Sequence, residues 1–535
     1  MKRNLLKAIG ISFLIFAVLS WLIPVGTYSN GQLSTKGIDP VGLIDLFNAP
    51  VQSFITFVLY GVVFATIGGF YGVMEKTGAL EKVTEKMKAS FNGHEKGFLI
   101  LTVILFTVLS SLTGLVIPLF VLVPLFAAVL FAMNYDKVTV LASTVGSLLV
   151  GSIASTYGFN ITGYTKNILS LSMSNQIVAK IILLIILTVA LIFVVLTTSK
   201  RAVKKEAKVV KDEKELKAAK VVKDEVEVKS QKSAKTSKKA VKSSAKKESQ
   251  PAKKSSKTTA KKTTKKVTKK TTKALAVTKS VKKVSEKSKV SAVPFVIIFV
   301  LMLIVCLVGM YNWYYSFGID VFNDMHTAIM GVKIKDFKIF DNLLSGISQL
   351  GYWSNVEFTG ALIITSGIIA WIYKVNFNDY VESFIAGVKK WLPTAIYAAL
   401  ASVILSILYQ ASYNGTGTLV DTINAKLFGL TDGFNVLTTG LSALLGSFFF
   451  NDLYYLLASL QPFVAGFGAS SLSIAGLLIQ SVYAIGMMIF PTSGVLIAGL
   501  SLFDVSYKEW IKYIWKFVLI TLLLVLLVCG ILTLL

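Results

Sequence analysis

The apolar residues of this chain gather into long runs, most of them about 20 residues long, which are separated by short polar segments. A helix of that length crosses the ~30 Å hydrocarbon core of a bilayer, so each run predicts a transmembrane helix. The predicted spans are 8–24, 53–74, 138–165, 178–198, 293–312, 345–374, 391–411, 474–500 and 512–533.

Two further apolar stretches, 97–133 and 436–470, are too long for one helix and are interrupted near the middle. The first contains SSLTG at 110–114, and the second contains Asn451 and Asp452. Such a break in the hydrocarbon region is tolerated only where protein or a water-filled cavity satisfies the freed backbone groups. We therefore expect two re-entrant hairpins.

Two of the predicted spans are themselves interrupted. The run 138–165 contains ASTYGFNITG at 154–163, and the run 474–500 contains FPTSG at 490–494. Glycine and hydroxyl residues at these places predict broken helices. Half-helix N-termini present partial positive charge to an anionic group, and freed carbonyls can hold a cation, so the breaks are candidate binding elements.

The order of a span, a hairpin, a broken helix and a final span occurs twice, in 53–198 and in 391–533. The first unit begins out-to-in and the second in-to-out, so we expect inverted repeats. The first membrane part, 1–199, adds the span 8–24, and the second, 291–535, adds two spans. The predicted fold class is an all-α polytopic membrane protein with about nine transmembrane helices and two re-entrant hairpins.

Composition supports this class and localises the charge. The chain is 54% hydrophobic and 16% charged, which excludes an ordinary soluble protein. Of its net charge of +27, the segment 200–290 holds nearly all, with 33 basic and 9 acidic residues. This segment lacks aromatic residues, and its many positively charged side chains repel one another. It therefore predicts a disordered insertion. Lys2, Arg3 and Lys7 place the N-terminus in the cytoplasm, and the same threading places the insertion there.

The lysine-rich insertion has three interpretations. It can be a flexible cytoplasmic tether, or it can adsorb to anionic lipid, where each lysine contributes ~1 kcal/mol. It can also bind nucleic acid or ribosomes by neutralising phosphates, although it offers no aromatic side chain for base stacking.

Candidate solute-binding or ion-binding residues are polar side chains at the breaks and within spans. They are Ser110, Ser111, Thr113, Ser155, Thr156, Asn160, Thr162, Glu357, Asn451, Asp452, Thr492 and Ser493. The alternative for the hydroxyl residues is hydrogen bonding within the helices. Glu357, about a dozen residues into its span, can bind solute, couple protons or serve as a structural hydrogen-bond partner. Asp452 can attract an ammonium group or a coupling cation, or simply cap the hairpin tip.

Little in the chain supports enzyme chemistry. Its two cysteines both lie in apolar runs and it has two histidines, so a disulfide framework, a metal site or a histidine triad is not expected. The sequence contains no Walker A loop for ATP and no HExxH motif. We expect no catalytic residue, no metal site and no cofactor, apart from Na⁺ or H⁺ as a coupling ion.

Four segments resemble one family of carriers. They are FPTSGVLIAGLSLFDVSYKEWIKYIWK (Phe490–Lys516), IPVGTY (Ile23–Tyr28), GGFYGVMEKTGALEK (Gly68–Lys82) and SNVEFTGALIITSGII (Ser354–Ile369). They are similar to the YfcC-type carriers of the ion transporter superfamily, which also includes the AbgT and dicarboxylate carriers. The resemblance covers both membrane parts. It does not cover the insertion.

The resemblance implies uptake or exchange of small organic solutes, namely dicarboxylates or, in some branches, arginine and ornithine. It also implies a homodimer. The chain departs from the family at both hairpin tips, where SSLTGLVIP replaces a Glu-containing tip and FFFNDLYYLLASLQP replaces a Ser-Gly-Ser-Gly-like tip. The resulting prediction is a secondary transporter for a small amino acid or organic acid in a bacterial plasma membrane, ion-coupled or an exchanger. The alternative is a membrane-anchored tether that acts through the lysine-rich insertion.

Overall fold

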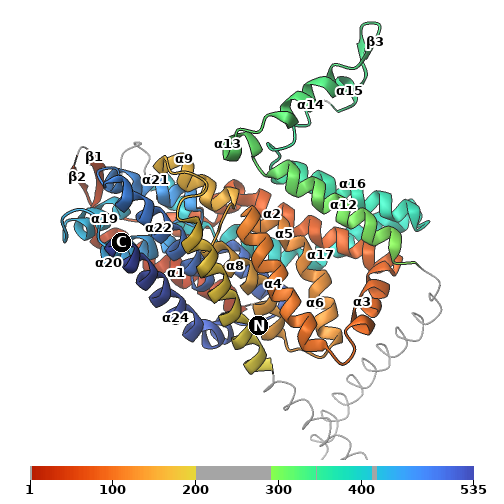
Figure 1. Ribbon diagram of the computed structural model, residues 1–535, viewed down its shortest axis with the longest axis horizontal. Helices are drawn as coiled ribbons and strands as arrows, with labels where there is room; N and C mark the ends of the chain where they lie inside the picture. The colour runs from red at the N-terminus through yellow and green to blue at the C-terminus, as the bar shows by residue number, and fades with distance from the viewer. Residues whose placement is uncertain (1–2, 30, 200–290, 345, 412–417) are drawn as a thin grey trace, which may run out of the picture. The chain divides into compact units, whose positions relative to one another are not determined.

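The computed structural model describes residues 3–29, 31–199, 291–344, 346–411 and 418–535, so the lysine-rich insertion lies outside the described residues (Figure 1). The residues on its two sides pack together as one unit. Almost all described elements are helices, which confirms the predicted all-α class. Nine helices in the described ranges are long and apolar enough to span a membrane: Asn4–Leu22, Asp45–Thr77, Glu95–Thr113, Ile177–Ser199, Val293–Met310, Asn355–Ile372, Phe377–Leu408, Ala469–Phe503 and Tyr507–Leu534.

The elements before the insertion begin with one helix and a β-hairpin. Their bounds are α1 Arg3–Leu22, β1 Val25–Ser29, β2 Gln32–Gly37, α2 Asp45–Thr77, α3 Ala79–Ser90, α4 Glu95–Thr113, α5 Val116–Leu119, η1 Phe120–Leu122, α6 Val123–Ala132, α7 Lys137–Leu141, η2 Ala142–Gly146, α8 Ser147–Ile153, η3 Phe159–Gly163 and α9 Tyr164–Leu169. The long helix Ile177–Ser199 follows. The segments η2 and η3 are π-helical.

The elements after the insertion begin with two extra spans and a short peripheral region. Their bounds are α12 Val293–Met310, α13 Trp313–Phe317, α14 Val321–Met330, β3 Lys333–Ile334, β4 Phe337–Lys338, α15 Ile339–Leu343, α16 Asn355–Ile372, α17 Phe377–Leu400, α18 Val403–Ala411, α19 Leu419–Phe428, α20 Val436–Phe449, α21 Leu453–Val464, α22 Ala469–Ile489, α23 Gly494–Phe503 and α24 Tyr507–Leu534. The extra spans α12 and α16 lie side by side (Figure 1).

The predicted repeat is visible in the order of the elements. Each unit has a long first helix (α2 or α17), a short amphipathic helix (α3 or α19) and a helical hairpin (α4 with α5 and α6, or α20 with α21). A broken helix and a final long helix complete each unit. The first broken helix is interrupted at 154–158, between α8 and η3, and the second at 490–493, between α22 and α23.

The first helices of the two units run antiparallel, as inverted repeats require. Along their contact, the residue numbers fall in α2 while they rise in α17. The paired residues are Lys76 with Asp379 at 2.9 Å, Gly68 with Gly387, and Ser53, whose Oγ donates to the Ala399 carbonyl at 3.0 Å. A Cβ atom on Gly387 would lie 2.1 Å from the Gly68 carbonyl oxygen. The absence of a side chain at Gly387 therefore permits the close approach of α2 and α17.

Each hairpin packs on its own broken helix through a glycine. A Cβ on Gly151 would lie 2.3 Å from the Thr107 carbonyl oxygen and 2.8 Å from Ser110 Cβ. A Cβ on Gly486 would lie 1.9 Å from Ser447 Oγ. Both glycines precede their break by a few residues, so the same contact brings each hairpin tip to the interruption that follows.

The final helix α24 shows how the apolar surface is divided. One face contacts the protein core, and the opposite face exposes large aliphatic side chains, as expected for a helix that borders lipid. The buried face includes Ile514, Phe517, Thr521 and Val525, whereas the exposed face includes Leu519, Ile520, Leu523, Leu527 and Ile531.

Several boundaries differ from the prediction. The span predicted at 345–374 begins only at Asn355, because Gly346 and Gly351 have positive φ values and Ser354 caps the helix. The span predicted at 391–411 begins earlier, at Phe377, since charged residues lower the hydropathy of its first turns. The run 138–165 is divided into short helices, and Glu95–Thr113 is long enough to span by itself. The hydropathy pattern did not predict the β1–β2 hairpin.

Candidate functional site

Both units contribute to one cavity of about 350 Å³. The first hairpin lines it at 114–118 and the second at 451–453. The two broken helices line it at 159–161 and at 493–495. The first helices and the extra spans contribute Tyr60, Phe64, Ala398, Met310 and Asn355. All four interrupted elements therefore meet around the same space.

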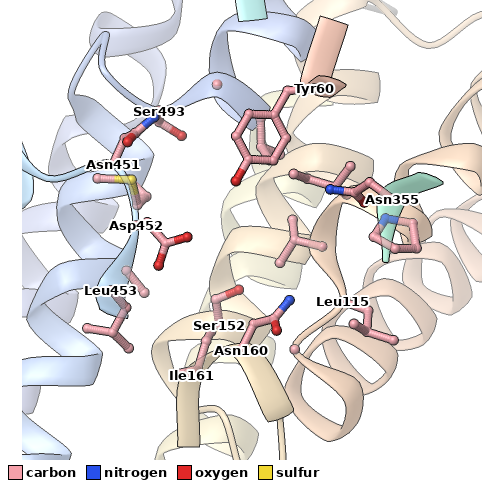
Figure 2. A pocket seen from close by; sticks show the side chains of 18 of the residues that line it. Tyr60, Leu115, Ser152, Asn160, Ile161, Asn355, Asn451, Asp452, Leu453 and Ser493 are labelled. Carbon is pink, nitrogen blue, oxygen red and sulfur yellow. The ribbon is translucent and has the colours of Figure 1, made fainter. Parts of the chain in front are cut away.

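Asp452 is the single charged side chain among the described residues that line this cavity. Its carboxylate lies in the space between the second hairpin and the first broken helix, opposite Ser152 and Asn160 (Figure 2). Asp452 Oδ1 accepts a hydrogen bond from the Tyr454 backbone N–H at 2.9 Å, so it also caps α21. One acidic side chain thus fixes the hairpin tip and also lines the cavity.

Asn451 places an unsatisfied acceptor beside this carboxylate. Its Nδ2 donates to Ser402 Oγ, which joins the hairpin tip to the α17–α18 segment. Its Oδ1 is buried and has no hydrogen-bond partner in the described part of the chain. A buried amide oxygen without a partner is costly by about 1–3 kcal/mol, so a bound donor such as an ammonium group would satisfy it.

The second break offers a helix N-terminus to the same cavity. Ser493 is the N-cap of α23, and its Oγ accepts from the Leu496 N–H at 3.3 Å. Gly494 and Val495, in the first turn, line the cavity. Thr492 is buried, and among the described residues its Oγ1 has no partner. First-turn N–H groups and the helix dipole favour an anionic group such as a carboxylate.

The first break is closed by hydroxyl groups. Ser111 Oγ donates to the Ala154 carbonyl at 2.7 Å, and the Thr156 N–H donates to the Ser111 carbonyl at 3.1 Å. Thr162 Oγ1 donates to the Ser155 carbonyl at 2.9 Å. Ser155 Oγ and Thr156 Oγ1 donate to the Ser111 carbonyl, at 3.4 Å and 3.3 Å. These bonds satisfy backbone groups that the interruption frees, so all four side chains have a structural role at the break.

Two glycines bring the first hairpin tip onto this break. Gly114 has φ +68°, and its Cα faces Gly158 so closely that a Cβ on either residue would lie within 3 Å of the other backbone. Ser110 Oγ donates to the Leu148 carbonyl at 2.6 Å and lies 3.2 Å from Ser152 Oγ. Thr113 Oγ1 donates to the Leu109 carbonyl at 2.7 Å in its own helix.

The predicted site residues therefore fall into two groups. Asn160, Asn451, Asp452 and Ser493 line the cavity. The remaining predicted site residues are not part of the cavity lining in the described part of the chain. They lie at the breaks or at a helix end. This second group consists of Ser110, Ser111, Thr113, Ser155, Thr156, Thr162, Glu357 and Thr492.

Glu357 lies at the N-terminus of α16, although the hydropathy pattern placed it about a dozen residues into its span. It is the third residue of the helix, and its Oε2 accepts from the Ser354 N–H at 2.7 Å and from Ser354 Oγ at 2.6 Å. Its Oε1 accepts from Ser348 Oγ at 3.4 Å. Because Ser354 and Asn355 line the cavity, Glu357 fixes a cavity wall through this capping box.

Several lining residues did not come from the sequence pattern. Tyr60, Tyr164 and Tyr483 bring aromatic rings to the cavity, and Ser152 and Asn355 bring small polar groups. The Tyr60 hydroxyl and the Asn160 amide both point into the space that Asp452 faces (Figure 2). A tyrosine in an apolar run looks the same in the sequence whether it lines a cavity or packs in the helix core. The hydropathy pattern therefore contains no signal that identifies the cavity-lining tyrosines.

Comparison with known proteins places these features in a family. A search of curated protein sequences found no match. Among solved structures, the chain is similar to the Alcanivorax borkumensis YdaH transporter at 14% identity, with a TM-score of 0.36 and with 99% of this chain and 97% of that chain covered. The family model described as "DcuC: C4-dicarboxylate anaerobic carrier" matches residues 7–242 and 255–534. The match includes 200–242 and 255–290, so the expectation that the resemblance leaves out the insertion is wrong. Because this match spans both membrane parts, the chain belongs to the C4-dicarboxylate anaerobic carrier family and is a multi-pass membrane transporter, which confirms the resemblance seen in its motifs.

Proposed function

We propose that this protein is a secondary active transporter that moves a small amino acid across the plasma membrane of a bacterium by alternating access. The observation that supports an amino acid is the charge of the cavity, because Asp452 is the single charged group among its described lining residues. Asp452 and the free Asn451 Oδ1 offer acceptors for an ammonium group. The N-terminus of α23 offers donors for a carboxylate.

The size of the cavity agrees with a small zwitterion. Small-molecule sites have volumes of about 300–1,000 Å³, and this cavity lies at the low end of that range at about 350 Å³. Asn160, Asn355 and Ser152 would hydrogen-bond the rest of the solute, while Phe64 and Met310 would contact its apolar part. The hydroxyl groups at the first break, together with Thr113 and Glu357, would not contact the solute. They would affect binding by positioning the segments that line the cavity.

The inverted units provide a route to alternating access. The antiparallel α2 and α17 relate one unit to the other, so exchanging the conformations of the two units would turn an outward-open cavity into an inward-open one. Coupling to Na⁺ or H⁺, or exchange of two solutes, would then set the direction. The N-terminus and the segment 200–290 are placed in the cytoplasm in this proposal.

A dicarboxylate is the second candidate, because the family description names C4-dicarboxylates. A dianion would meet Asp452 without a basic side chain among the described lining residues. It would therefore require a cation on Asp452, either Na⁺ or a proton, and would bind its carboxylates at helix N-termini. In this case Asp452 is a coupling-ion residue rather than a ligand of the solute.

Uptake by reconstituted vesicles distinguishes these candidates. Amino acids and C4-dicarboxylates are tested under imposed Na⁺ gradients, under H⁺ gradients and with internal solute for exchange. The proposal expects amino-acid uptake that falls about 10- to 100-fold in Asp452→Asn, since a hydrogen bond to a charged group contributes about 1.5–3 kcal/mol. The exposed Asp432→Asn is the matched control. Dicarboxylate uptake that depends on Asp452 and on a cation gradient would support the second candidate, and no flux for any solute would contradict both.

Two further expectations concern the lysine-rich insertion and the oligomeric state. Removing 202–288 should leave transport intact if the insertion is a tether, whereas a function in binding nucleic acid, ribosomes or anionic lipid should be lost with it. A homodimer, which the family resemblance implies, is tested by light scattering of the purified protein in detergent.

A further inference from the structure

Lys180 is a fully buried lysine in the membrane region. It is the fourth residue of the helix Ile177–Ser199, and its side chain is 0% exposed. Its Nζ donates to Thr162 Oγ1 at 3.4 Å, and in the described ranges no carboxylate lies within ion-pair distance of it. An ionisable group at such a position costs several kcal/mol of solvation, so it calls for a functional explanation.

The hydrogen-bond partner of the amine, Thr162 Oγ1, belongs to a cluster of oxygen atoms at the first break. Thr162 Oγ1, which accepts from Lys180, itself donates to the Ser155 carbonyl at 2.9 Å. Gln480 Nε2, from α22 of the second unit, donates to the same carbonyl at 3.2 Å. Gln480 is fully buried, and its Oε1 has no partner among the described residues. Hydroxyl, carbonyl and amide oxygens of this kind coordinate small hard cations.

The second unit shows that the scaffold does not need an amine at this place. Trp510 is the fourth residue of α24, the corresponding helix, and it is also 0% exposed. Its Nε1 donates to the Met488 carbonyl at 2.8 Å, just before the second break. A neutral side chain therefore holds the same place counted from the start of the helix. It satisfies a carbonyl before its break, whereas Lys180 contacts a hydroxyl after its break. The amine of Lys180 is an addition specific to the first unit.

We propose that the Lys180 amine is a tethered cation at the oxygen cluster formed by Ser155, Thr162 and Gln480, where it takes the place of a dissociable sodium ion. The covalent link keeps this position occupied throughout the transport cycle. The carrier then needs no Na⁺ at the first break. Removing the amine leaves a small cavity lined by the same oxygens, which a sodium ion can enter.

Binding is tested on the full chain in detergent, with Na⁺ as the probe. Thermal unfolding is followed in NaCl and in KCl at equal concentration, so that chloride and ionic strength stay constant. We expect no Na⁺-specific stabilisation of the wild type and a saturable Na⁺-specific rise of the unfolding midpoint in Lys180→Ala. Lys180→Met, which refills the space with an apolar side chain, should not respond. The exposed Lys86→Ala is the control for loss of a lysine elsewhere.

Two results would overturn the proposal. One is Na⁺-specific stabilisation of the wild type that matches that of Lys180→Ala. The other is a folded, monodisperse Lys180→Ala that shows no preference for Na⁺. If that variant does not fold, Lys180→Ser takes its place, because it leaves the same space and adds one more oxygen. The response should also disappear when Thr162→Val is added to the responding variant.

Transport gives a second readout, and this readout alone rests on the proposed function. With a transported solute that is not coupled to Na⁺ at Asp452, wild-type uptake should be equal in Na⁺ and K⁺ media. Lys180→Ala should be about tenfold or more faster in Na⁺ than in K⁺. If Lys180→Ala shows the Na⁺-specific stabilisation but no solute is transported, the tethered cation is supported. Only the proposed transport function is then contradicted. Equal uptake by Lys180→Ala in both media would count against the tethered cation itself.

Discussion

The two broken helices share one architecture and differ in chemistry. At the first break, hydroxyl groups and the Lys180 amine are buried and are not part of the cavity lining among the described residues. At the second break, the fourth residue of the last helix is Trp510 instead of a lysine, and Ser493 lines the cavity together with Asp452. Both breaks line the cavity, through Asn160 in the first unit and Ser493 in the second. The first break carries in addition a buried cluster of hydroxyl groups and an amine, so side-chain chemistry distinguishes two similar backbone arrangements.

The largest effect is expected where a hairpin touches its broken helix through backbone. In Gly151→Ala the new methyl group meets the Thr107 carbonyl oxygen at 2.3 Å, and a backbone atom cannot rotate away. Overpacking of this kind destabilises by about 3 kcal/mol. The thermal unfolding midpoint in detergent should fall clearly. Gly530→Ala, in α24 with no atom within 4 Å, is the control and should be neutral or slightly stabilising.

A smaller loss is expected from the aromatic residue of the second unit. Trp510→Phe keeps a ring in place but removes the donor to the Met488 carbonyl. A buried acceptor left without its partner costs about 2 kcal/mol. The same unfolding measurement checks this value. A change near zero would show that the Met488 carbonyl finds another donor, and Trp510 would then be a poor counterpart of Lys180.

Next in size is the contrast between the hydroxyls of the two hairpins. Ser111 Oγ donates across to the Ala154 carbonyl, whereas Ser447 Oγ donates to the Leu444 carbonyl in its own helix. Ser111→Ala should therefore destabilise by about 1 kcal/mol more than Ser447→Ala. Comparing the two unfolding midpoints tests this difference. Equal losses would mean that the first break does not depend on its hydroxyls more than the second does.

The smallest effect is expected at the polar end of the helix pair α2 and α17. Lys390 Nζ lies 2.8 Å from Glu75 Oε1, and both side chains are more than half exposed. An ion pair in such a setting contributes about 0.5 kcal/mol or less. Glu75→Gln should barely change the unfolding midpoint, and the difference should vanish in high salt. A larger loss that shrinks in high salt would indicate that the two units are held together by charge rather than by the glycine contacts.

The sequence pattern located the interrupted elements well. It was less successful in identifying the individual side chains that line the cavity or hold the breaks. Both hairpin tips and both breaks were predicted within a few residues, because small and polar residues in a lipid-crossing run have a clear physical meaning. Glu357 was placed too deep, since a hydropathy run includes the apolar loop residues before Ser354. Lys180 was overlooked, because a single charge near the end of the run 178–198 resembles an interfacial residue.

The missed lining residues have a different cause. Tyr60 and Tyr483 lie in helices whose sequence indicates only burial, and their shared cavity depends on where the fold places α2 and α22 around it. Asn160 and Thr162 are two residues apart and equally polar, yet the first lines the cavity and the second holds the break. The rotation of the π-helical segment η3 decides between them, and no local property of the sequence sets that rotation.

Residue order alone determined the membrane class, the two-fold repetition of elements and the positions of the breaks, because hydrophobic length and interruption are local properties that the bilayer constrains. The tertiary structure decided which side chains share one space. It placed Asp452, Asn451 and Asn160 around the cavity and buried Lys180 beside Ser155 and Gln480, residues that are up to 325 positions apart. Such proximity results from the antiparallel packing of the two units, and hydropathy along the chain does not encode which faces of the helices will meet.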